Sequence, residues 1–223
     1  MDDSRNWSVA DTAEACSQSS SNWRGAPFWA LNGELEVEEI RRQIRMFAQC
    51  GLGGFFLHAR TGLRTPYLSE KFFEAIESAV DEAEKCGMQA WLYDEDRYPS
   101  GACGGMVTKD PQHRAKGIFL EEVSAQEVKN YQFPERLIAL FTAVIEGDSA
   151  YRVKRIFPEQ AENIAPDETL LVFYADTIAC SPWYNGYTYL DTLSKESVRH
   201  FINLTHETYK ARLGEKFGKV IPG

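Results

Sequence analysis

The stretch QAWLYDEDRYPSG, residues 89–101, changes from an apolar run to three consecutive carboxylates within a few positions. Its Trp-Leu-Tyr run at 91–93 is typical of a buried strand. The acids at 94–96 follow directly, and a Pro-Ser-Gly turn comes after Arg97 and Tyr98. In parallel α/β folds, ligand-binding groups gather at the carboxyl ends of strands. This stretch therefore predicts a strand that ends at a functional site.

The residues upstream repeat the same strand-and-loop pattern twice. GAPFWALNG (25–33) and LGGFFLHAR (52–60) are apolar, strand-like runs. Each precedes a segment with apolar residues at helical spacing, 34–51 and 68–87, which contains a glycine at its end. Ser69 is the predicted N-cap of the second helix. The pattern predicts βα units that form a parallel sheet.

We divide the chain into four segments. Residues 1–24 form a polar N-terminal arm, and residues 25–116 contain the first βα units. Residues 117–176 hold short β-type runs between polar turns, which indicates an antiparallel β insertion. Helical periodicity returns in residues 177–223, which we interpret as a further βα unit that stops as another strand begins.

The charge and the N-terminal sequence exclude several classes of partner. A net charge of −9 would repel both nucleic-acid backbones and anionic membrane surfaces, so we expect neither as a partner. The first 23 residues are polar and contain no apolar run of the kind found in signal peptides or membrane spans. We therefore expect a cytoplasmic protein.

The three predicted strands all end in polar or aromatic side chains. These are Trp29 and Asn32 on the first strand, His58 and Arg60 on the second, and Asp94, Glu95, Asp96 and Arg97 on the third. We expect His58, Arg60 and the three acids to converge on one concave surface, because the ends of parallel strands meet at one edge. The alternative is three independently charged loops.

Carbohydrate is the ligand that these residues favour. Carboxylate oxygens accept hydrogen bonds from neighbouring sugar hydroxyls. The loop SPWYNGYTYLD, residues 181–191, adds Trp183, Tyr187 and Asp191, and aromatic faces of this kind pack against pyranose rings. The alternative for this loop is packing beneath the β insertion.

A metal centre is not predicted. His58 lies in His-Ala-Arg, which differs from the His-x-His pair of metal-dependent barrel hydrolases. We also expect at least one of the acids at 94–96 to pair with Arg97 or Arg60.

Four phrases occur in order between residues 27 and 105: PFWALNG, GGFFLHAR, TPYLSE and WLYDEDRYPSG. Together they resemble the N-terminal part of the catalytic barrel of α-L-rhamnosidase-like glycoside hydrolases, family 106 and its uncharacterised relatives. The resemblance resumes between residues 189 and 223. It implies an α/β fold: a partial (β/α)8 (TIM-type) barrel with parallel strands and an antiparallel β insertion. It also implies a longer enzyme that cleaves terminal deoxysugars from glycans.

The expected mechanism needs two carboxyl groups, which inverting glycosidases hold roughly 6.5–9.5 Å apart. Asp94 and Glu95 are the catalytic candidates, but neighbours on a strand point to opposite sides, so a partner acid must come from elsewhere. Asp191 or a later strand outside this chain could supply it. We therefore expect the chain alone to hydrolyse aryl α-L-rhamnosides poorly or not at all, and a chain extended through the rest of the barrel to be active.

An alternative function is a non-catalytic carbohydrate-binding or assembly module that pairs with another chain. No cofactor is predicted, although the resemblance leaves calcium open as a ligand. The remainder of the barrel or a second chain is the expected macromolecular partner.

Overall fold

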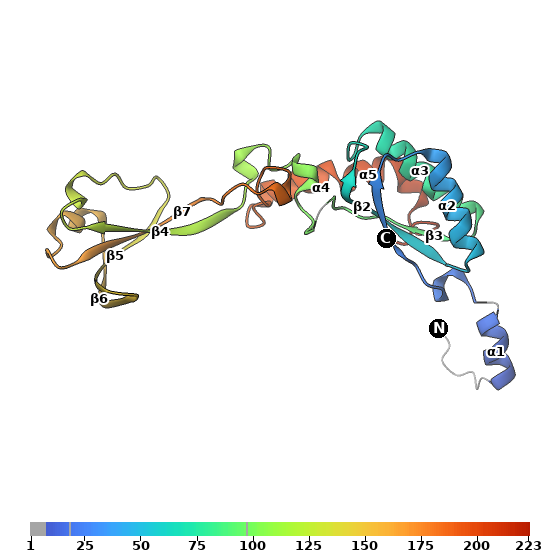
Figure 1. The fold of residues 1–223 in the computed structure, drawn as a ribbon, viewed down its shortest axis with the longest axis horizontal. Coiled ribbons are helices and arrows are strands. Elements are labelled where there is room, and N and C mark those ends of the chain that lie inside the picture. Colours follow the sequence, from blue (N-terminus) through green and yellow to red (C-terminus); the bar gives the residue numbers. More distant parts are fainter. Residues whose placement is uncertain (1–7, 18, 97) are drawn as a thin grey trace.

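The structure of the chain is a computed structural model that describes residues 8–17, 19–96 and 98–223. Two sheets lie at opposite ends of an elongated molecule (Figure 1). One sheet has three strands and lies beside the longest helices. The other has four strands and stands away from them, so the chain is organised around two separate sheets.

The three-stranded sheet is parallel, in the order β1-β2-β3. Its strands are β1 (Phe28–Gly33), β2 (Gly54–Leu63) and β3 (Gln89–Trp91). Helix α2 (Val37–Gln49) connects β1 to β2, and α3 (Glu70–Lys85) connects β2 to β3. We call this part the parallel unit.

The apolar residues at helical spacing bury one face of the parallel sheet. Ile44 of α2 and Ile76 of α3 pack in one cluster with Phe55 and Leu57 of β2. The Ser69 side chain accepts a hydrogen bond from the Phe72 N–H and caps α3, as the sequence predicts. The two helices and one sheet face therefore share a core.

The four-stranded sheet is antiparallel, in the order β4-β7-β5-β6. Its strands are β4 (Lys116–Ser124), β5 (Leu137–Glu146), β6 (Ser149–Ile156) and β7 (Thr169–Thr177). They lie where the sequence pattern indicates antiparallel strands. Val123, Leu140 and Leu170 belong to a second buried cluster, so this antiparallel unit has a core of its own.

Three further α-helices complete the described chain. They are α1 (Val9–Ser17), α4 (Lys195–Leu204) and α5 (His206–Leu213). Short 3-10 turns occupy Ser21–Trp23, Cys103–Gly105, Pro111–His113, Val128–Asn130, Pro158–Asn163, Pro182–Tyr184 and Gly214–Lys216. Tyr209 and Leu213 of α5 join the core of the parallel unit.

The prediction of a partial (β/α)8 barrel is wrong. The parallel sheet has three strands, and the other sheet is separate and antiparallel. The segment 177–223, expected to supply a further βα unit, forms helices and turns, with no strand starting among its residues. Ala90 and Leu92 donate backbone hydrogen bonds to Val220 and Gly223, but a turn at Gly218 and a single bridge replace a regular strand. After β3 the chain continues through 3-10 turns into the antiparallel unit instead of a further parallel strand, and a sheet of three strands is too small to close into a barrel.

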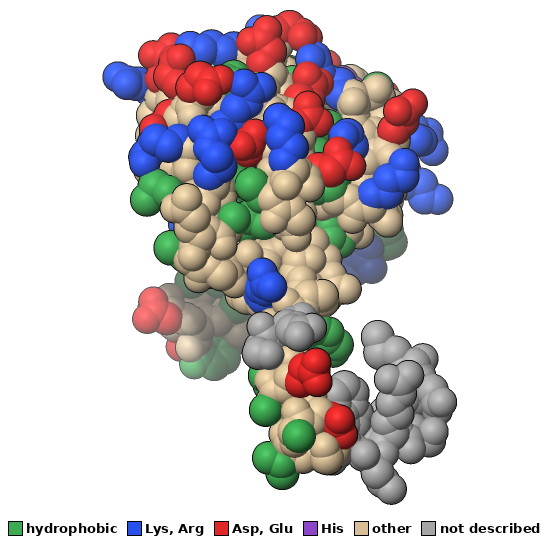
Figure 2. Space-filling model, turned by 90° about the vertical axis from the view of Figure 1, so that its right-hand side faces the viewer, with side chains coloured by type: hydrophobic (Ala, Val, Ile, Leu, Met, Phe, Trp, Pro, Cys, Tyr) green, Lys and Arg blue, Asp and Glu red, His purple; other side chains and the backbone are tan. Residues whose placement is uncertain are grey.

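The helical side of the parallel unit is covered by intermixed charges (Figure 2). Glu38 pairs with Arg41 within α2, and Arg45 of α2 pairs with Glu82 of α3. Such pairs belong to a solvated face rather than a ligand site. Among the residues that the structure describes, no helix is long and apolar enough to cross a membrane.

Candidate functional site

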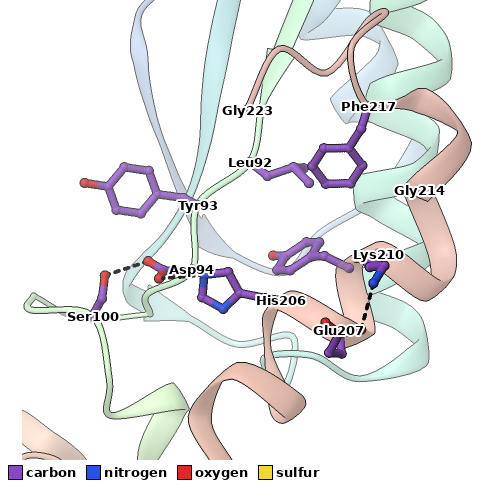
Figure 3. A pocket seen from close by; sticks show the side chains of 11 residues that line it. Leu92, Tyr93, Asp94, Ser100, His206, Glu207, Lys210, Gly214, Phe217 and Gly223 are labelled. Atoms are coloured by element: carbon purple, nitrogen blue, oxygen red, sulfur yellow. Dashed lines mark hydrogen bonds and ion pairs between the residues drawn. The ribbon is translucent and has the colours of Figure 1, made fainter. Parts of the chain in front are cut away.

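A cavity of about 680 Å³ lies beyond the carboxyl end of β3, and we call it the Asp94 hollow. It lies between the residues that follow β3, helix α5 and the turn after α5 (Figure 3). Asp94, Ser100 and His206 lie close together at its polar end. Leu92 and Phe217 form a facing apolar wall. The hollow therefore offers polar and apolar surfaces to one ligand.

The Asp94 carboxylate is fixed by two neighbours. The Ser100 hydroxyl donates to Oδ1 at 2.6 Å, and His206 Nε2 lies 3.5 Å from Oδ2. His206 is anchored in turn, since its Nδ1 lies 2.8 Å from the Thr205 hydroxyl. The carboxylate side chain stays 31% exposed, so it can still meet a ligand.

The apolar wall is formed by two segments that are far apart in the sequence. Leu92 follows β3, whereas Tyr209 and Phe217 come from α5 and the turn beyond it. Tyr209 is buried against Phe73, with the ring centroids 5.3 Å apart. A second acid that lines the hollow, Glu207, is paired with Lys210 at 3.3 Å.

Glu95 lies in a different environment from Asp94. Its Oε1 is 3.1 Å from His58 Nε2, and both side chains are buried. The His58 ring packs against Phe28 and Tyr93, with both centroid distances 4.4 Å. These aromatic rings enclose the pair on the sheet face that faces away from α2 and α3.

Burial controls the protonation of this pair. It lowers the pKa of His58, because desolvation disfavours the charged ring more strongly than Glu95 favours it. His58 Nδ1 is buried and has no hydrogen-bond partner among residues 8–17, 19–96 and 98–223.

Asp96 faces a third environment. Its Oδ1 accepts from the Gly104 N–H at 2.9 Å, and its Oδ2 accepts from Asn185 Nδ2 at 3.1 Å. It lines a second cavity of about 200 Å³ together with Arg60 and Arg64, which we call the Arg60 hollow. Within the described chain, no ion pair joins Asp96 to either arginine.

The expectation of one surface shared by five residues is therefore corrected. His58 and Glu95 come together, Arg60 and Asp96 come together, and Asp94 lines a separate hollow. Strand β3 ends at Trp91, so the acids lie in an irregular segment in which each side chain meets different partners. The three consecutive acids therefore lie in three different environments.

Other predicted site residues lie elsewhere. Trp29 points to the helical side and packs on Phe47 and Phe55, at centroid distances of 5.2 and 5.4 Å, so it belongs to the core. Asn32 is exposed at the end of β1 and lines neither hollow. Arg97 lies outside the described residues.

The aromatic loop 181–191 does not line the Asp94 hollow. Trp183 Nε1 donates to the Tyr98 carbonyl, and the Tyr187 ring lies 5.6 Å from the Arg114 guanidinium carbon. Asp191 accepts from Lys116 Nζ at 2.5 Å. Burial opposes ionisation of Asp191, but the hydrogen bonds from Lys116 and the Leu193 N–H outweigh it and lower the pKa. Asp191 is therefore committed to an ion pair.

The site contains residues that the sequence reasoning missed. Ser100, His206 and Tyr209 all line the Asp94 hollow, yet α5 lies more than one hundred positions beyond Asp94. The Pro-Ser-Gly turn pointed to Ser100 only as a turn residue. No local pattern marks His206 as a neighbour of an acid, because its position depends on how α5 packs on α3.

The described part of the chain contains no group of three or more His, Cys, Asp or Glu side chains placed to hold a metal ion. The three acids at 94–96 point to different partners, which separates the oxygens that a calcium ion would need together. Comparison of the chain with protein-family models and with curated proteins found no match.

Proposed function

We propose that the chain binds a carbohydrate in the Asp94 hollow and acts as part of an α-L-rhamnosidase-like glycoside hydrolase. The observation that carries this proposal is the pairing of a fixed, partly exposed carboxylate with an apolar wall in one cavity of about 680 Å³. Cavities of roughly 300–1,000 Å³ with a few convergent polar groups are typical of small-ligand sites. A sugar ring presents hydroxyls to one side and C–H groups to another, which matches both surfaces.

Each lining residue has a chemical role in this proposal. Asp94 accepts hydrogen bonds from a hydroxyl pair or, as a catalytic group, exchanges a proton with the glycosidic oxygen or a water molecule. Ser100 and His206 hold its orientation. Leu92 and Phe217 contact the apolar face of the sugar. Glu95, buried beside His58, supports the segment and does not touch the ligand.

A non-catalytic carbohydrate-binding module is the second candidate, and one observation favours it. Glycoside hydrolysis usually needs two carboxyl groups that face the same substrate. The other acid that lines the hollow, Glu207, is already paired with Lys210. Asp94 would then bind sugar without a catalytic partner in the described chain.

A paired assay separates the two candidates. Binding of L-rhamnose and hydrolysis of an aryl α-L-rhamnoside are measured for the purified chain and for Asp94→Asn. The control is Asp167→Asn, an exposed acid paired with Arg152 in the antiparallel unit. Slow hydrolysis above background that Asp94→Asn abolishes supports the hydrolase, and binding without hydrolysis supports the module. Absence of both L-rhamnose binding and hydrolysis would contradict both candidates.

A further inference from the structure

The Arg60 hollow is separate from the Asp94 hollow and has a different chemistry. It lies at the carboxyl end of β2 and is lined by Arg60 and Arg64, the backbone around Gly62, and Asp96. Two arginines against one acid give its lining residues a net positive formal charge. This is unusual on a chain with a net charge of −9.

Neither arginine forms an ion pair within the described chain, and the one acid that senses Arg64, Glu34, is paired with Lys71. Several other arginines form ion pairs, including Arg41 with Glu38 and Arg212 with Glu70 and Glu77. Arg60 and Arg64 are exposed and make no ion pair or side-chain hydrogen bond within the described chain. Their donors are therefore free to bind an anion.

The one acid in the hollow is directed to other donors. Asp96 accepts from the Gly104 N–H and from Asn185, so both of its oxygens have partners. Gly104 adopts a φ of +62°, and a Cβ there would lie 3.5 Å from Asp96 Oδ2. Both donors are neutral groups that do not cancel the formal charge of the carboxylate, so the excess positive charge of the lining comes from two arginines against one acid.

We propose that the Arg60 hollow binds the carboxylate of an acidic sugar, a uronic acid unit of the glycan that the chain recognises. The sugar assignment rests on the proposed function, whereas the anion preference rests on the two arginines. A guanidinium group matches a carboxylate with two parallel hydrogen bonds. A volume of about 200 Å³ is below the roughly 300–1,000 Å³ of drug-sized ligand cavities, which suits the charged end of one sugar unit.

The test is a titration of the isotope-labelled chain with D-glucuronate, followed residue by residue by NMR. D-glucose is the neutral counterpart, and inorganic phosphate is the simple anion. The variants are Arg60→Gln and Arg64→Gln. The control is Arg199→Gln, which removes an exposed arginine of α4 that lines neither hollow. The unfolding midpoint of each variant is measured to verify folding.

We expect glucuronate to shift resonances of residues 60–67 and 104, and glucose to leave them unchanged. Each hollow variant should weaken glucuronate binding at least about tenfold, because hydrogen bonds to a charged group contribute strongly. Arg199→Gln should bind as the unaltered chain does. Absence of these shifts, or equal binding by both hollow variants and the unaltered chain, would overturn the proposal.

The phosphate titration shows whether the Arg60 hollow recognises a sugar acid or any small anion. If phosphate binds as tightly as glucuronate and displaces it, the site recognises simple anions and the sugar assignment is wrong. Failure of the Arg60 proposal can also be distinguished from failure of the proposed function. L-rhamnose binding at residues 92–100 and its loss in Asp94→Asn report on the Asp94 hollow, and neither depends on Arg60.

Discussion

The parallel and antiparallel units are built in different ways, and only the parallel unit assembles distant residues. The antiparallel unit comes from one contiguous segment, 116–177, in which each strand follows the last without leaving the unit. In the parallel unit, the Asp94 hollow combines residues 92–100 with residues 206–223. The complete antiparallel sheet lies between these two segments in the sequence. The comparison teaches that the antiparallel unit is a separate structural addition.

The two cores support the same conclusion. The helices and the parallel sheet share one buried cluster, whereas Leu140, Leu170 and Val172 belong to another. No described residue belongs to both. A substitution that destabilises one core should therefore leave the other unit largely folded.

The largest expected effect comes from removing a buried aromatic ring. Phe55 is fully buried, so Phe55→Ala should lower the free energy of unfolding of the parallel unit by about 3–5 kcal/mol. The matched change in the antiparallel unit is Leu170→Ala, with an expected loss of about 2–5 kcal/mol. Hydrogen exchange followed by residue should show that each variant exposes its own unit. Equal loss of protection in both units would contradict their independence.

A smaller effect should follow from a substitution at Gly105, which packs against the aromatic loop 181–191. Gly105 has a φ of +85°, and an added Cβ would lie 2.8 Å from Tyr187 Cδ2. Gly105→Ala should therefore cost about 1–3 kcal/mol through backbone strain and this contact. The control is Gly147→Ala in the β5–β6 turn, where φ is +56° and nothing lies within 4 Å. Chemical denaturation should show the larger loss for Gly105→Ala, and equal losses would count against the close contact.

The sequence predicts the local elements better than the site. Helical spacing and the Ser69 cap placed α3 correctly, and alternation placed the antiparallel strands. Those features depend on neighbours in the chain. The overall fold was mispredicted because three strand-and-loop rounds do not determine whether the chain after β3 adds more parallel strands.

The site could be predicted only in part, for the same reason. The acids at 94–96 were recognised as unusual, and strand alternation already indicated that neighbours diverge. That alternation also places Trp29 on the opposite face from Phe28, so its position in the core could have been predicted. The approach of His206 to Asp94 could not, because it depends on tertiary packing of α5.

The smallest expected effect concerns pH. Burial lowers the pKa of His58 in the folded chain, so the unfolded chain binds more protons between that pKa and about 6.5. Stability should therefore fall as pH drops below about 6.5, by at most about 1.4 kcal/mol per pH unit from this group. Denaturation experiments between pH 7 and 5.5 should show that the free energy of unfolding depends less steeply on pH in His58→Gln than in the unaltered chain. A slope unchanged by His58→Gln would show that this histidine is not the group responsible.

The most direct test of the central claim is to locate where a neutral sugar binds. The labelled chain is titrated with L-rhamnose, and NMR shifts are mapped for the unaltered chain and for Asp94→Asn. We expect shifts at residues 92–100 and 206–217 that Asp94→Asn greatly reduces, and none in β4 to β7. Shifts concentrated in the antiparallel unit, or shifts that Asp94→Asn leaves unchanged, would contradict the assignment of the ligand site to the Asp94 hollow.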